Sequence, residues 1–113
     1  MELLDKDGYP TVKFLRVIKT WKHDSNISLE DLLGLIEEAW CYRDIAFKRR
    51  QPRNGYQTIE MHTVGWSGSE DIINAILSNL WLTQFRLRYV KWYTGGHHYF
   101  KFKLFSSCFL RCL

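Results

Sequence analysis

The sequence predicts a single α+β domain, in which an antiparallel sheet has helices packed on one face. Apolar residues recur at helical spacing in some segments and alternate with polar residues in others, in the order ααββαββ. The 113 residues suffice for one domain of ordinary size, and the 16% aromatic content supplies the apolar surface that a disordered chain lacks. No apolar run is long enough to predict a membrane-spanning helix.

The first two predicted elements are helices. Residues 11–22 follow a turn at residues 8–11 and place an apolar stripe on one side and cations on the other. Residues 28–41 begin at Ser28, which fits a helix N-cap because its hydroxyl can accept a backbone hydrogen bond. Gly34 lies inside this second helix, where it either weakens the helix or allows another element to approach closely.

A hairpin is predicted next. Residues 45–48, from Ile45 to Lys48, alternate in the manner of a strand, and Asn54-Gly55 is a strong signal for a hairpin turn. Residues 56–64 predict the returning strand. We expect Ile59, Met61 and Thr63 on one of its faces and Thr58, Glu60 and His62 on the other.

The second half of the chain predicts one more helix and two more strands. Ser67 and Glu70 have the spacing of a capping box, and the helix that they open should end near Asn79. Residues 81–93 alternate like one long strand, although a helix continuing from residue 72 to about residue 90 is the competing interpretation. Residues 97–104 predict the last strand. The apolar tail, residues 105–113, must pack on the domain or on a partner.

Positive charge is concentrated in the second half. The formal net charge is +4, but residues 1–43 hold 6 Lys and Arg against 8 Asp and Glu, whereas residues 44–113 hold 10 against 4. If residues 86–88 pair with residues 101–103, one sheet face carries cations beside a tyrosine, as single-stranded nucleic acid or an acidic protein requires. A solvated sheet face is the alternative. The residues concerned are Arg86, Arg88, Tyr99, Lys101 and Lys103.

The hairpin turn and the segment before the third helix supply further candidates. Lys48, Arg49, Arg50 and Arg53 cluster at the turn, with Asp44 as the only carboxylate nearby in sequence. We therefore expect this cluster to contact a partner, a mobile exposed loop being the alternative. Trp66 is either a core residue or an exposed anchor residue of the kind enriched at binding hot spots.

No catalytic or cofactor-binding pattern is evident, so we expect neither an enzyme nor a cofactor. The histidines and acidic residues have no spacing of a triad or a metal site, and adjacent residues such as His97 and His98 point to opposite faces of a strand. A zinc site would need Cys108 and Cys112 with two more ligands, such as these histidines. Three cysteines and an acidic N-terminus without a signal peptide predict a cytoplasmic protein.

Three segments carry a resemblance to a group of small phage and prophage proteins. In that group a Gly-Trp-Ser-Gly-Asn-Glu type segment and a Gly-Gly-His-Tyr type turn recur. The resemblance spans residues 9–103 and implies an accessory protein of a bacterial host's cytoplasm, with no activity or functional residues to carry over. The segments here are Tyr9-Pro10-Thr11, Gly65-Trp66-Ser67-Gly68-Ser69-Glu70-Asp71 and Gly95-Gly96-His97-His98-Tyr99-Phe100.

The leading hypothesis is a non-enzymatic, anti-CRISPR-like binding protein that inhibits or modulates a host nucleic-acid-handling or defence complex by protein contact. Direct binding to single-stranded nucleic acid is the first alternative, and a small hydrolase or nucleotide-handling enzyme centred on His97 or His62 is the second. The aromatic content and apolar tail also suggest a homodimer. The expected contact residues are Arg49, Arg50, Arg53, Trp66, Arg86, Arg88, Tyr99, Lys101 and Lys103.

Overall fold

The computed structural model describes the chain except residues 23, 86, 94 and 104–113, so the apolar tail and its cysteines lie outside it. At residues 85, 88, 91–93 and 103 the description is confined to the backbone. The elements are α1 (Val12–Thr20), α2 (Leu29–Ala39), α3 (Arg43–Ala46), β1 (Phe47–Arg49), β2 (Tyr56–His62), α4 (Ser67–Ser78), α5 (Leu80–Phe85), β3 (Leu87–Tyr93) and β4 (His97–Lys103). No helix among the described residues is long and apolar enough to cross a membrane.

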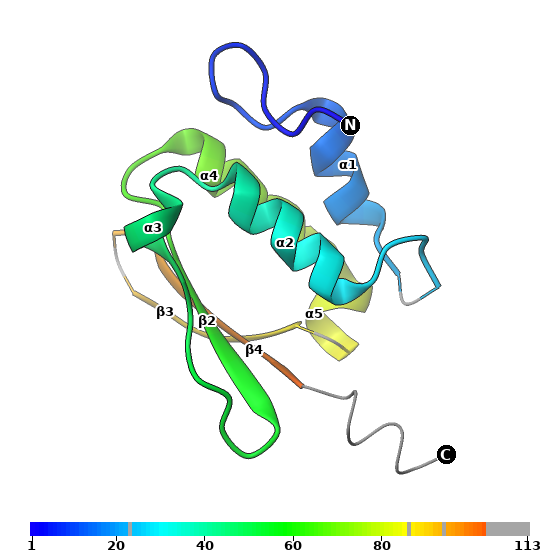
Figure 1. The fold of residues 1–113 in the computed structure, drawn as a ribbon, viewed down its shortest axis with the longest axis vertical. Coiled ribbons are helices and arrows are strands. Elements are labelled where there is room, and N and C mark those ends of the chain that lie inside the picture. The colour runs from blue at the N-terminus through cyan, green and yellow to red at the C-terminus, as the bar shows by residue number, and fades with distance from the viewer. Residues whose placement is uncertain (23, 86, 94, 104–113) are drawn as a thin grey trace.

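The strands form one antiparallel sheet in the order β1-β2-β4-β3. Helices α2 and α4 lie over one face of this sheet, and in the described part of the chain no helix covers the other face (Figure 1). The predicted α+β class, with helices on one face, is therefore confirmed. The central pair, β2 and β4, joins segments far apart in sequence and brings His62 opposite His97.

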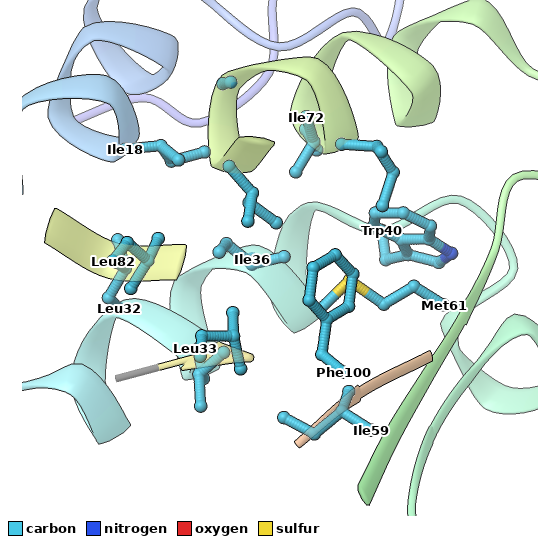
Figure 2. Packing of buried hydrophobic residues seen from close by; sticks show 14 of the residues in the cluster. Ile18, Leu32, Leu33, Ile36, Trp40, Ile59, Met61, Ile72, Leu82 and Phe100 are labelled. Carbon is cyan, nitrogen blue, oxygen red and sulfur yellow. The ribbon is translucent and has the colours of Figure 1, made fainter. Parts of the chain in front are cut away.

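The core lies between the sheet and the helices. Ile59 and Met61 of β2 and Phe100 of β4 are fully buried, and Figure 2 shows them pointing toward the side chains of α2 and α4. Ile36 and Ile72 fill the space from the helix side. Ile59 and Met61 face the helices and alternate in sequence with Thr58, Glu60 and His62, as the period of two predicts, although Glu60 is also buried.

Side-chain caps fix the starts of α1 and α2. The Thr11 hydroxyl accepts a hydrogen bond from the Phe14 N–H at 3.1 Å, and the Ser28 hydroxyl accepts one from the Asp31 N–H at 3.0 Å. The predicted N-cap at Ser28 is confirmed. Both helices end two residues earlier than their spacing predicts, at Thr20 and Ala39.

The prediction of one strand over residues 81–93 is wrong in its first part. Residues 80–85 form α5, and the strand begins only at Leu87. Asn79 is the cause, because its buried amide donates to the carbonyls of Ile18 and Trp21 at 2.7 and 2.8 Å while its side-chain oxygen accepts from the Leu82 N–H at 3.0 Å. This residue thus ends α4 and starts α5, which also excludes a continuous helix to residue 90.

Two other local predictions are also corrected. Ile45 does not begin a strand but lies in the short helix α3, where it is 68% exposed, and β1 starts at Phe47. Ser67 does not cap α4, because Trp66 is the N-cap residue and makes no side-chain cap hydrogen bond. The Glu70 N–H instead bonds to the Trp66 carbonyl at 3.2 Å. Ser67 is the first helical residue, so the helix begins one residue earlier than a capping box with Ser67 as the N-cap requires.

Replacing Gly34 with alanine should stabilise the protein. Gly34 is exposed in the middle of α2, and a Cβ atom there would meet nothing within 4 Å, so no element approaches this position closely. Alanine loses less backbone entropy in a helix, and we expect the free energy of unfolding to rise by about 0.5–1 kcal/mol. Urea denaturation followed by circular dichroism measures this; a decrease would contradict the placement of Gly34.

Candidate functional site

Polar and aromatic side chains gather on the sheet face that the helices leave uncovered, which we call the open face. Strand alternation places them there, since the neighbouring residues of the same strands point into the core. Arg50 joins them just beyond β1, where its N–H bonds to the Thr58 carbonyl at 2.9 Å. The open face comprises Lys48, Arg50, Tyr56, Thr58, Glu60, His62, His97, Tyr99 and Lys101.

The expected pairing of residues 86–88 with residues 101–103 is found where the chain is described. Leu87 pairs with Phe102, and Arg88 with Lys101. Lys103 pairs with Tyr56 on the other side of β4, while Arg86 lies outside the described residues. The backbone register therefore extends the open face to Arg88 and Lys103, and to Lys91 opposite Tyr99.

Arg49 lies on the helix side of the sheet, away from the open face. One of its terminal nitrogens is 2.7 Å from Glu30, and its Nε is 3.5 Å from Glu37, so both partners belong to α2. The expectation that only Asp44 could neutralise the arginine cluster is therefore wrong. Strand alternation separates Arg49 from its neighbours Lys48 and Arg50, which leaves Arg49 as a link between β1 and α2.

Arg50 is paired with Glu60 on the open face. Burial acts to raise the pKa of Glu60, but hydrogen bonds from Arg50 and His62, together with the charge of Arg50, hold the pKa below its ordinary value. Glu60 is therefore ionised near neutral pH. Arg50 and Arg53 also line, with Arg49, a hollow of about 570 Å³ at the hairpin. Arg53 is exposed there, and its backbone bonds to Tyr56 close the turn.

Trp66 is half-buried and holds the N-terminal loop against the start of α4. Its ring stacks on that of Tyr9, with 4.7 Å between centroids and 25° between planes. The indole also lies against Gly68, where a Cβ atom would come within 2.5 Å of the ring nitrogen. Trp66 thus belongs neither to the central core nor to the open face, and its stacking on Tyr9 accounts for its position.

A hydrogen-bonded chain of three side chains lies on the open face where β2 ends and β4 begins. The Nδ1 atoms of His62 and His97 are 2.7 Å apart, and Nε2 of His62 is 3.3 Å from Oε1 of Glu60. The Tyr99 ring meets the His62 ring edge-on at 5.9 Å. Such a chain can hold a proton at a defined nitrogen. Sequence spacing did not link these residues, because His62 and His97 meet only through the pairing of β2 with β4.

His98 lies on the opposite face from His97, as strand alternation predicts. It is buried, and its Nδ1 is 2.7 Å from the hydroxyl of Tyr89. Burial lowers the pKa of His98, although the charge of Glu70 acts in the opposite direction. The two rings border a pocket of about 450 Å³ between α4 and the β3–β4 hairpin. Among the residues that the structure describes, no three His, Cys, Asp or Glu side chains form a group suited to a metal ion.

These observations define an α+β domain with a basic and aromatic open sheet face. Comparisons with models of protein families, with curated proteins and with solved structures found no match for this chain. Function is therefore inferred from the open face itself.

Proposed function

We propose that the protein binds single-stranded nucleic acid through the open face of its sheet. The observation that carries this proposal is the alternation of cations with aromatic rings on a sheet surface that the described helices leave free. A single strand offers phosphates to cations and unstacked bases to rings, and open sheets with this composition meet both needs.

The cations available for phosphates are Lys48 and Lys101. Both are exposed, and neither makes a salt bridge to another described residue. Among the described residues of this face, Glu60 is the one carboxylate; it is compensated by Arg50 and therefore contributes little repulsion. In the backbone register of β3, Arg88 pairs with Lys101 and Lys91 pairs with Tyr99. The open face thus has a clear excess of positive charge.

The rings proposed to stack on bases are those of Tyr56 and Tyr99. Tyr56 is 43% exposed near the hairpin, with the Lys101 ammonium 5.9 Å from its ring centroid. Tyr99 is half-buried beside His62 in the middle of the face. The two tyrosines lie on adjacent strands, so a strand of nucleic acid that crosses β2 and β4 would meet one ring and then the other. Base stacking of this kind is tolerant of sequence.

Fluorescence anisotropy with a labelled single-stranded oligothymidylate tests the proposal. We expect micromolar binding that weakens steeply with salt, with a slope of log K against log[salt] of about −2 to −3 for three or four phosphate contacts. A duplex of the same length should bind less tightly, because its bases cannot stack on the tyrosines. Absence of binding at low salt, or binding insensitive to salt, would contradict the proposal.

A phage-type modulator that docks on a host nucleic-acid-handling or defence complex is the second candidate. The exposed apolar side chains of Tyr42 and Ile45 favour it, because they are 67% and 68% exposed at the short helix α3, which directly precedes β1. Apolar and aromatic groups next to cations are typical of protein interfaces. Capture from a bacterial lysate, with and without nuclease, separates the candidates: a protein partner retained after nuclease supports docking, whereas loss of all bound material supports direct binding.

A further inference from the structure

The short distance between His62 and His97 fixes the positions of the protons in the chain with Glu60. Two imidazole nitrogens 2.7 Å apart share one proton, since one must donate and the other accept. Ionised Glu60 only accepts, so Nε2 of His62 carries a proton. Neutral His62 then has a bare Nδ1, and Nδ1–H of His97 is the donor to it. One nitrogen of the chain is left without a proton, Nε2 of His97.

Proton uptake by this chain is consequently limited to one site. A proton added at Nε2 of His97 leaves both hydrogen bonds in place and makes the bond to His62 charge-assisted. A second proton, on Nδ1 of His62, would remove the acceptor and set two cations side by side. The pair can therefore take up one proton, and no more, with both hydrogen bonds intact.

The surroundings leave this added charge uncompensated. Glu60 on β2 is already matched by Arg50, and the other charged side chains described on this face, Lys48 and Lys101, are cations. The Tyr99 ring on β4 meets the His62 ring edge-on; Tyr93 of β3 lies opposite His97 in register, and His98 points to the other face. Gly95 adds no side chain near Nε2 of His97, from which a Cβ atom at that position would be only 3.5 Å away.

We propose that Nε2 of His97 is a proton-gated contact for a phosphate oxygen of the bound strand, so that single-stranded nucleic acid binds more tightly as the pH falls from 8 to 6. This proposal rests on the proposed nucleic-acid function and adds its regulation. The protonated nitrogen donates a charge-assisted hydrogen bond to the phosphate, while the unprotonated nitrogen at pH 8 has no hydrogen to donate.

Nitrogen-15 NMR of the free protein tests the protonation pattern without any ligand. We expect Nε2 of His97 to become protonated between pH 8 and pH 5, while the two Nδ1 atoms share a single proton over the same range. Conversion of both rings to independent imidazolium ions would overturn the proposal, whatever the protein binds.

Binding of the labelled oligothymidylate at pH 8 and pH 6 tests the contact. We expect about three- to fivefold tighter binding at pH 6, which is the gain in affinity that one exposed ion pair typically contributes. The slope of log K against log[salt] should be steeper by about 0.7 at pH 6, because one phosphate contact is added. His97→Asn can keep a donor near the position of Nδ1 but cannot take up the proton, so its ratio of affinities at the two pH values should fall to about one. His98→Asn, on the opposite face, is the matched control and should keep the wild-type ratio.

The outcomes separate the two proposals. Equal affinity of the wild type at pH 8 and pH 6 overturns the gated contact and leaves the nucleic-acid function standing. Absence of binding at both pH values overturns both together. His97→Asn that keeps the wild-type ratio of affinities at pH 6 and pH 8 shows that the proton is taken up elsewhere, and overturns the contact. Loss of that ratio in His98→Asn, with the fold intact, has the same meaning.

Discussion

Replacing Lys48 and Lys101 together with glutamate is expected to weaken binding of the single-stranded oligothymidylate by on the order of 100-fold at low salt. The two lysines are exposed on neighbouring parts of the open face, so both substitutions put negative charge where phosphates would lie. The salt slope should also become shallower by about 1.4, because two phosphate contacts are lost. Anisotropy titrations over a salt series measure both quantities.

The matched control reverses two cations on the helix side. Lys13 and Arg16 are exposed on α1, so Lys13→Glu with Arg16→Glu changes the net charge by the same amount without touching the open face. We expect this variant to keep most of the wild-type affinity. Equal losses in the two double variants would mean that overall charge, and not the open face, determines binding. Circular dichroism of both variants confirms that the fold is retained.

Replacing Gly96 with alanine is expected to lower the free energy of unfolding by about 2–5 kcal/mol. Gly96 has φ of +84°, where side chains are strained, and a Cβ atom there would lie 2.0 Å from Oγ1 of Thr63. Thr63 is fully buried and its N–H bonds to the Gly96 carbonyl at 2.9 Å, so neither residue can easily move. Urea denaturation measures the loss.

Gly55 offers a control for the part of this stability loss that comes from backbone strain alone. Its φ is +81°, but a Cβ atom there would meet nothing within 4 Å. Gly55→Ala should therefore cost only the strain of the left-handed conformation, about 1–2 kcal/mol. The excess cost at Gly96 is assigned to Thr63, and adding Thr63→Ala to Gly96→Ala should recover part of it. A double variant no more stable than the sum of the single changes predicts would contradict that assignment.

Features that depend on neighbours in sequence could be predicted. The Ser28 cap, the Asn54-Gly55 turn and the faces of β2 each follow from a few consecutive residues. The break at Asn79 could not, because it is fixed by carbonyls of α1 about 60 residues earlier in the chain. Residues 81–85 alternate well enough for a strand, and only the cap from Asn79 commits them to a helix.

The sequence predicts the basic and tyrosine-bearing face of the candidate site, but it does not predict the hydrogen-bonded chain on that face. The tyrosine and lysine positions of β4 were expected on one face, and the register agrees with that expectation. The chain of Glu60, His62 and His97 could not be predicted in this way, because it depends on the non-local pairing of residues 56–62 with residues 97–103. Two histidines, one at the end of a strand and one at the start of a later antiparallel strand, were the available signal.

The order of the strands also bears on the risk of aggregation through the edges of the sheet. The two outer strands, β1 and β3, have one paired edge each within the described sheet, and free edges invite pairing with other chains. β1 has only three residues and is followed closely by Pro52, while β3 is interrupted by a bulge between Tyr89 and Lys91. Short, kinked and lysine-bearing edges resist strand addition. The sheet can therefore expose a whole face to a ligand without offering its edges as a template for aggregation.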